Sequence, residues 1–197
     1  MRAAMSELAI RPMNVAEFLR WDDGSDTRYE LVGGFPLAMA PPAEAHWMLA
    51  TRLAARIDTA LAGRRPCNAQ VEAGITRLDR ADSYFVADIA ATCAQNERGR
   101  QAVKDPILIV EILSPGTERH DRLTKVPVYR NIESVEEILL IDSESLYAEV
   151  LRRDGDRWIT QLVRGPDGVL RLASVDLAVA MAEVYDGIDI AGGEDAG

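Results

Sequence analysis

PILIVEILSPGTERHDRLTKVPVYR, residues 106–130, is the stretch that decides the fold. It begins with an apolar run from Ile107 to Leu113 that contains a single carboxylate, Glu111. Such a run of β-branched and aliphatic residues is typical of a central strand that is covered on both faces. An ionised carboxylate on that strand is costly unless it is paired or binds a metal. We therefore expect Glu111 to have a partner.

Composition limits the number of domains and the kinds of ligand. The 197 residues, 48% of them hydrophobic, are enough for one core, so we expect a single domain over residues 1–185. The glycine-rich, acidic tail 186–197 is expected to be disordered. A net charge of -10 argues against a generally basic nucleic-acid surface. The segment from Arg98 to Arg130 is nevertheless net positive and could form a local basic patch.

The cysteines and the termini bear on location. Cys67 and Cys93 are the only cysteines, which predicts free thiols in a reducing compartment. Residues 1–14 lack the apolar core of a secretion signal, and no apolar run approaches membrane-spanning length. The sequence thus predicts a cytoplasmic protein that is not bound to a membrane.

Hydrophobic periodicity and turn signals predict an α/β (α+β) protein with a mixed sheet flanked by helices. Helices are predicted at residues 15–19, 43–62, 121–130 and 177–185. Strands are predicted at residues 29–32, 35–39, 71–78, 84–91, 107–113, 137–142, 147–152, 158–163 and 169–172. Pro127 is irregular within the third helix because proline removes one hydrogen bond and introduces a kink.

Two carboxylates, Asp88 and Glu111, interrupt apolar strands. If these strands are neighbours, the two acids converge, and two oxygen ligands plus waters suit Mg²⁺ or Mn²⁺. Such a site can hold a phosphate oxygen and lower the pKa of a bound water. Lys125 is the candidate cation that orients this water. Only two of the 22 basic residues are lysine, which indicates a need for a compact charge at this position.

The chain resembles the Uma-type endonucleases, a bacterial group within the PD-(D/E)XK nuclease superfamily. The resemblance spans roughly Asn14 to Tyr185 and is most specific in VEILSPGTERHDRLTKVPVYR, residues 110–130. Its other matches are Tyr29-Glu30-Leu31 with Gly34, Pro41-Pro42 with His46, and the strand that contains Asp88. The resemblance implies a restriction-endonuclease-like fold with a central mixed sheet and Mg²⁺-dependent hydrolysis of phosphodiester bonds. It also implies DNA as the partner and, by analogy with the fold, a homodimer.

The resemblance implies roles for particular residues. The implied catalytic residues are Asp88, Glu111, Lys125 and Glu30, and the implied metal ligands are Asp88, Glu111 and Ile112. The family lysine normally lies two residues after the motif acid, where this chain has Leu113, so Lys125 would take over its role. The chain departs from the family pattern at Ala87, Gly33 and Pro127, and Pro127 could displace Lys125.

Other interpretations remain open. His46 also fits a residue at the start of a helix that is hydrogen-bonded to neighbouring backbone. Ser114, His120 and Asp121 could suggest a hydrolase triad, but no nucleophile-elbow pattern surrounds the serine. An alternative function is a catalytically inactive protein-interaction module on the same fold, which the acidic charge and Pro127 favour. The sequence leaves the strandedness and base specificity of the substrate open.

Overall fold

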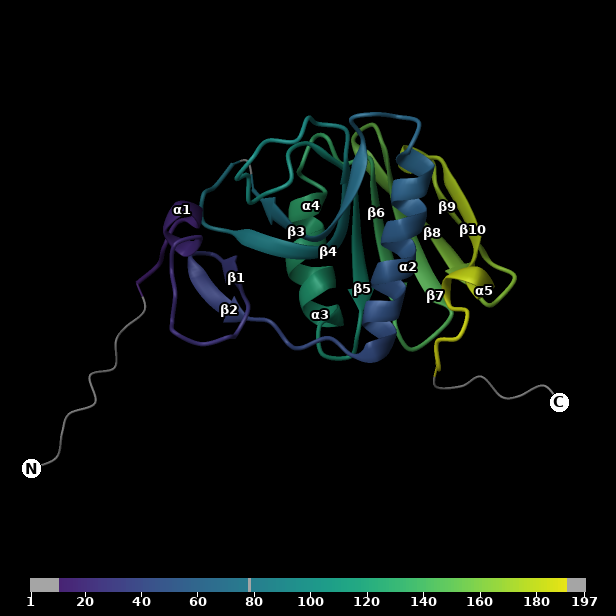
Figure 1. Cartoon of the computed structure of the whole chain (residues 1–197), viewed down its shortest axis with the longest axis horizontal. Coiled ribbons are helices and arrows are strands. Elements are labelled where there is room, and N and C mark those ends of the chain that lie inside the picture. The colour runs from purple at the N-terminus through teal and green to yellow at the C-terminus, as the bar shows by residue number, and fades with distance from the viewer. Residues whose placement is uncertain (1–10, 78, 191–197) are drawn as a thin grey trace, which may run out of the picture. The chain divides into compact units, whose positions relative to one another are not determined.

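The computed structural model describes residues 11–77 and 79–190 (Figure 1). The chain divides into two compact units. The smaller unit consists of Met1–Met39 with Thr76–Phe85, and the larger unit consists of Ala40–Ile75 with Val86–Gly197. No helix in the described ranges is long and apolar enough to cross a membrane.

The smaller unit contains a short helix and a hairpin. Its elements are α1 (Val15–Phe18), β1 (Tyr29–Val32) and β2 (Phe35–Ala38). The α1 helix begins with a complete capping box, in which the side chains of Asn14 and Glu17 each accept a hydrogen bond from the other residue's backbone N–H. The strands are antiparallel and turn at Gly33 and Gly34, whose positive φ angles of 58° and 88° suit glycine. Both predicted features are confirmed.

The larger unit is built on a mixed sheet. It contains most of β3 (Asn68–Thr76) and of β4 (Tyr84–Thr92). Its other sheet strands are β5 (Pro106–Leu113), β6 (Glu137–Asp142), β7 (Tyr147–Asp154) and β8 (Arg157–Arg164). Their order is β4-β5-β6-β7-β8, with β3 paired to β4. Strands β5 and β6 are parallel, whereas the β4–β5, β6–β7 and β7–β8 pairs are antiparallel. The predicted class, a mixed sheet with flanking helices, is confirmed.

The long helix α2 (Glu44–Leu61) covers one face of this sheet (Figure 1). Its buried residues share a core with alternate residues of β5, because successive side chains of a strand point to opposite faces. This core contains Leu49, Leu53, Ile57 and Leu61 of α2 and Leu108, Val110 and Ile112 of β5. Glu111 therefore points to the other face. The chain after β5 forms α3 (Glu118–His120), a π-helical turn η1 (Asp121–Lys125) and α4 (Val126–Tyr129).

The predicted terminal helix at residues 177–185 is wrong. Its first half is a strand, β10 (Leu177–Ala180), which pairs antiparallel with β9 (Val169–Leu172), and only α5 (Met181–Val184) is helical. A 3-10 turn, η2 (Ala173–Val175), and Asp176 at φ 55° reverse the chain between the two strands. Aspartate tolerates this left-handed conformation better than most residues. In the predicted tail, Ile188 is buried, and residues 191–197 lie outside the described part.

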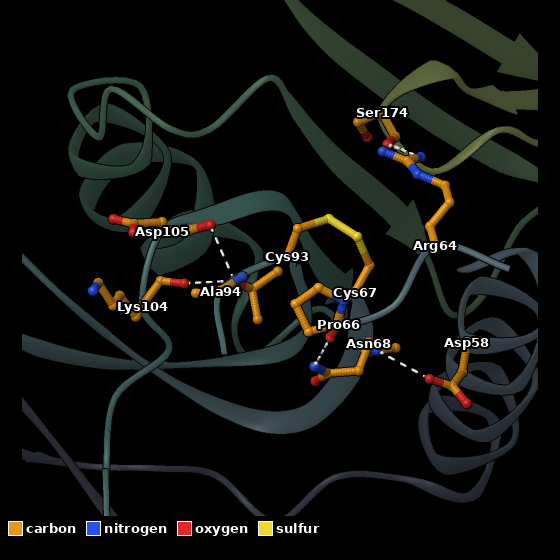
Figure 2. Close-up of a disulfide and its surroundings, with 12 residues drawn as sticks. Asp58, Arg64, Pro66, Cys67, Asn68, Cys93, Ala94, Lys104, Asp105 and Ser174 are labelled. Atoms are coloured by element: carbon orange, nitrogen blue, oxygen red, sulfur yellow. Dashed lines mark hydrogen bonds between the residues drawn. A yellow bond between two sulfur atoms is a disulfide. The ribbon is translucent and has the colours of Figure 1, made fainter. Parts of the chain in front are cut away.

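The prediction of free thiols is also wrong. Cys67 and Cys93 form a disulfide with a Cα–Cα distance of 3.8 Å (Figure 2). Cys67 directly precedes β3 and Cys93 directly follows β4, and these two strands pair. Strand pairing therefore brings together two cysteines that are 26 residues apart in sequence.

Candidate active site

The two carboxylates lie on adjacent strands. β4 and β5 are antiparallel, and Ile89 pairs with Val110, so Asp88 and Glu111 occupy neighbouring positions just beyond this pair. The backbone N–H of Ile112 donates a hydrogen bond to Oδ2 of Asp88 at 2.6 Å. The structure thus brings Asp88, Glu111 and Ile112 together, as the convergence of two interrupted strands predicts.

Glu111 is a buried carboxylate with two donors. Its side chain is only 2% exposed. The hydroxyl of Tyr129 donates to Oε1 at 2.6 Å, and Nζ of Lys125 donates to Oε2 at 3.3 Å. Burial raises the pKa of Glu111 well above its ordinary value, the charge of Asp88 raises it further, and Lys125 and Tyr129 counteract part of this rise. Glu111 therefore has the partner that its place in an apolar strand requires.

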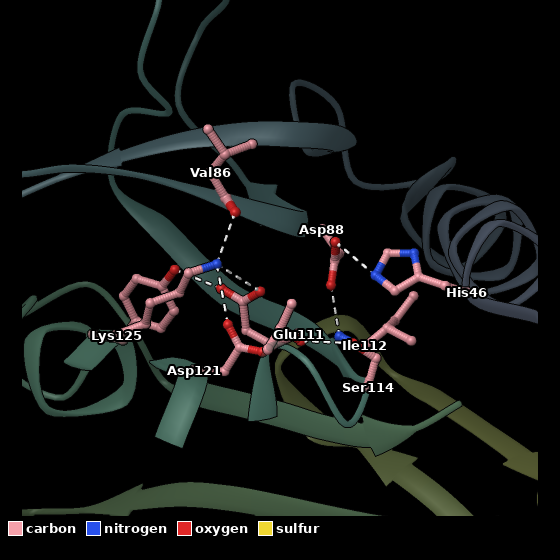
Figure 3. Close-up of polar contacts among 10 residues, drawn as sticks. His46, Val86, Asp88, Glu111, Ile112, Ser114, Asp121 and Lys125 are labelled. Atoms are coloured by element: carbon pink, nitrogen blue, oxygen red, sulfur yellow. Dashed lines mark hydrogen bonds and ion pairs between the residues drawn. The ribbon is translucent and has the colours of Figure 1, made fainter. Parts of the chain in front are cut away.

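Lys125 is a buried cation, and acceptors surround its amino group. Besides Glu111, Nζ contacts Oδ1 of Asp121 at 3.2 Å and donates to the carbonyl of Val86 at 3.1 Å (Figure 3). The side chains of Lys125 and Asp121 are 6% and 4% exposed. Burial raises the pKa of Asp121, and Lys125 lowers it in part. Two carboxylates thus compensate the desolvated ammonium group, which also cancels part of their negative charge.

The π-helical turn explains how a helix with Pro127 still presents Lys125. The N–H of Val126 bonds to the carbonyl of Asp121, five residues earlier, which closes η1 just before α4. Pro127 is the second residue of α4 and directly follows the π turn, and Lys125 still contacts Glu111. Proline therefore does not displace Lys125 from Glu111. The helix is also longer than the predicted 121–130, because it starts at Glu118.

His46 lies on the other side of Asp88. It belongs to the first turn of α2, and its Nε2 is 3.2 Å from Oδ1 of Asp88. Figure 3 shows Asp88 between His46 and the group formed by Glu111 and Lys125. The other ring nitrogen, Nδ1, is buried and has no hydrogen-bond partner within the described ranges. The interpretation of His46 as a residue bonded to neighbouring backbone is therefore not what the structure shows.

Two further predictions concern Glu30 and the possible triad of Ser114, His120 and Asp121. Glu30 is 2% exposed and lies in β1 of the smaller unit, so its role as a ligand stays a prediction. The serine triad does not form around Asp121, because its carboxylate pairs with Lys125. Ser114 instead shares a hydrogen bond with Thr117, with 3.1 Å between their hydroxyl oxygens.

Three contributors to the site, Asp121, Tyr129 and His46, were not among the predicted site residues. Asp121, Lys125 and Tyr129 follow one another at intervals of four residues, which is the spacing of one helix face. That spacing was visible in the sequence and could have identified Asp121 and Tyr129 as partners of the lysine. His46 was marked by its match to the family pattern after Pro41-Pro42, but its contact with Asp88 depends on how α2 packs.

The donor set fits a hard divalent cation. Asp88 and Glu111 offer carboxylate oxygens, and Ile112 has only its backbone carbonyl to offer as a ligand. Mg²⁺ typically binds one or two carboxylates and keeps several waters, so it requires no cage of protein ligands. The described residues include no group of three or more His, Cys, Asp or Glu residues that could hold a metal. The arrangement suits Mg²⁺ or Mn²⁺ better than a structural zinc.

Comparisons with known proteins agree with this fold. The family model Uma2, described as "Putative restriction endonuclease", matches residues 15–182. The Synechocystis protein slr1290, described as uncharacterized, is 27% identical over 175 residues, which cover 87% of this chain and 90% of that protein. A second one, sll1609, is 24% identical over 165 residues, which cover 82% and 93%.

A solved structure supports the same fold. The crystal structure described as a "putative nuclease belonging to DUF820", from Anabaena variabilis, superposes with a TM-score of 0.71 at 20% identity. The match covers 88% of this chain and 98% of that one. At this identity the likeness shows the fold alone.

Proposed function

This chain belongs to the Uma2 family, and from that premise we propose that it is a divalent-metal-dependent endonuclease that hydrolyses phosphodiester bonds of DNA. The observation that carries the proposal is the meeting of Lys125 with Glu111, beside Asp88 on the adjacent strand. A lysine and two acids at one place are the groups that such chemistry requires. The descriptions of the family and of the Anabaena protein favour the same reaction class.

Each residue has a distinct part in the proposed reaction. Asp88, Glu111 and the carbonyl of Ile112 would hold the cation, which when bound polarises a phosphoryl oxygen and acidifies water. Lys125 places a fixed positive charge beside these acids, where it can offset negative charge that develops on the phosphate. Its three N–H donors are taken by Glu111, Asp121 and the carbonyl of Val86, so it would orient the attacking water only by releasing one of these contacts. Tyr129 holds Oε1 of Glu111, so the carboxylate cannot rotate away.

DNA is the proposed substrate because the family is described as a restriction endonuclease, and the charge distribution suggests where DNA would bind. The net charge of -10 leaves little general affinity for a polyanion, so binding would depend on the net-positive segment from Arg98 to Arg130. This segment contains the helix that carries Lys125. Affinity for a DNA duplex should therefore fall steeply as the salt concentration rises. Binding that does not change with salt would contradict this part of the proposal.

A nuclease assay with Mg²⁺ or Mn²⁺ tests the function. The wild type should cleave plasmid and linear DNA, whereas Asp88→Ala and Lys125→Ala should not. Arg157→Ala and Asp154→Ala are matched controls, because these side chains are exposed and lie outside both the cluster and the segment from Arg98 to Arg130. Cleavage that survives both site substitutions would contradict the proposal. Absence of both cleavage and metal binding in the wild type would favour the non-catalytic interaction module.

A further inference from the structure

We infer that His46 is a positioning residue that fixes the Asp88 carboxylate for the divalent cation, an inference that rests on the proposed function. Two elements hold the two oxygens of this carboxylate. The ring of His46, from α2, contacts Oδ1 at 3.2 Å, and the N–H of Ile112, from β5, donates to Oδ2 at 2.6 Å. Figure 3 shows both contacts converging on Asp88.

The contact defines which nitrogen carries the hydrogen. An ionised carboxylate only accepts hydrogen bonds, so Nε2 of His46 must be the donor. In the neutral ring, Nδ1 is then an acceptor, and it is the atom that is buried without a partner in the described part of the chain. The contact therefore makes Nδ1 the acceptor, and the surroundings of the ring leave this acceptor without a hydrogen bond.

The unpaired nitrogen argues against a purely structural histidine. A buried acceptor without a hydrogen bond costs free energy, and an apolar side chain of similar size at this position would avoid that cost. What histidine provides here, and an apolar residue would not, is the N–H donated to Asp88. The side chain of Asp88 is 22% exposed, so water could solvate its carboxylate if the donor were absent. The fold therefore does not need the His46 contact to hydrogen-bond the Asp88 carboxylate. The contact is needed only if the carboxylate must be held in one orientation as a metal ligand.

The kind of donor differs between the two acids. Glu111 is paired with the ammonium group of Lys125, which cancels much of its charge. Asp88 is oriented by a ring N–H and a backbone N–H, without an ammonium group beside it. Hydrogen-bonding partners of metal ligands typically change metal affinity by about 10- to 100-fold when they are removed, because the ligand then has to be ordered on binding.

Calorimetric titration of the purified protein with Mn²⁺ at pH 8, where an ordinary histidine is neutral, tests the inference. His46→Ala should weaken the Mn²⁺ Kd by about 10- to 100-fold. His46→Gln keeps an N–H donor on a side chain of similar reach and should restore most of the affinity. His120→Ala, which removes the other histidine of the chain, is the matched control and should bind Mn²⁺ like the wild type.

The outcomes separate this inference from the proposed function. A wild type that binds no Mn²⁺ overturns the proposed function, and this inference with it. A wild type that binds Mn²⁺, together with an unchanged Kd in His46→Ala, overturns the inference alone. Failure of His46→Gln to bind more tightly than His46→Ala removes the donor role. Circular dichroism of the metal-free variants completes the test, because loss of the fold in His46→Ala would show a structural role and overturn the inference.

Discussion

Replacing Lys125 with methionine removes a buried charge while keeping a side chain of similar length. In the wild type, Nζ lies 3.3 Å from Oε2 of Glu111 and 3.2 Å from Oδ1 of Asp121, and all three side chains are buried. Lys125→Met therefore leaves two buried carboxylates without their shared cation. We expect a large loss of stability at neutral pH that shrinks when the carboxylates are protonated.

The magnitude follows from the distances. Two unit charges 3.3 Å apart interact by about 5 kcal/mol at an effective dielectric constant of about 20. Removal of one partner of a buried pair typically costs about 3–5 kcal/mol. The pKa of Glu111 and that of Asp121 are already raised in the folded state, and Lys125 opposes both rises. Without Lys125 both pKa values should rise further.

The sign of the pH dependence follows from these shifts. A carboxyl whose pKa is higher in the folded state than in the unfolded state binds its proton more tightly when folded. Its contribution to stability is therefore greatest below the unfolded pKa, about 4.3 for glutamate, and declines as the pH rises toward the folded pKa. The decline is about 1.4 kcal/mol per pH unit for each carboxyl. The stability gap between Lys125→Met and wild type should widen from pH 4 to pH 7.

Urea denaturation followed by circular dichroism at pH 4, 5.5 and 7 measures this gap. Lys104→Met is the matched control, because Lys104 is the other lysine and is exposed, and it should stay within about 0.5 kcal/mol of wild type. The double variant Glu111→Gln with Lys125→Met should recover part of the loss, because it removes one of the uncompensated charges. A gap that does not change with pH, or no recovery in the double variant, would refute the reasoning.

Three further predictions concern stability. Tyr129→Phe removes the hydroxyl that donates to Oε1 of Glu111 and should cost about 1.5–3 kcal/mol at pH 7 in urea denaturation; an unchanged midpoint would contradict this. Ser174→Ala removes one of two donors to Oε2 of the buried Glu137 and should cost about 1–3 kcal/mol, with the exposed Ser25→Ala as a near-neutral comparison. Reduction of the Cys67–Cys93 disulfide, which links residues 26 apart, should cost about 3.5 kcal/mol by the chain-entropy relation. As the control for the disulfide, the double variant Cys67→Ala with Cys93→Ala should show the same unfolding midpoint with and without reductant.

Local signals were sufficient for most elements of the sheet. The apolar run at residues 107–113 and the glycine pair after Val32 predicted β5 and the β1–β2 hairpin nearly to the residue. The interruption of two such runs by Asp88 and Glu111 was also enough to predict that these acids lie together. Their meeting depends only on β4 and β5 being neighbours, and a carboxylate in a buried strand needs a partner wherever the rest of the chain lies.

The features that sequence reasoning missed depend on pairing at long range. Alanine-rich 177–185 has helical propensity, yet residues 177–180 pair with β9 because Asp176 reverses the chain. Propensity is a weak signal that tertiary contacts override. Likewise, the spacing of Cys67 and Cys93 gives no disulfide signal by itself. The two strands predicted between them would have suggested it, because one cysteine precedes the pair and the other follows it.

The π-helical turn links the irregular proline to the geometry of the site. In a regular α-helix, positions four apart drift by about 40° around the axis, so Asp121 and Tyr129 would differ by about 80°. A π turn holds more residues per turn, so the η1 segment between Asp121 and Lys125 reverses part of that drift. Pro127 follows directly, and α4 ends at Tyr129, whose hydroxyl donates to Glu111. The turn thereby lets Lys125 and Tyr129 reach different oxygens of Glu111. Pro127 departs from the family pattern and could have displaced Lys125. It directly follows the π turn that ends at Lys125, and this turn keeps the lysine in contact with Glu111.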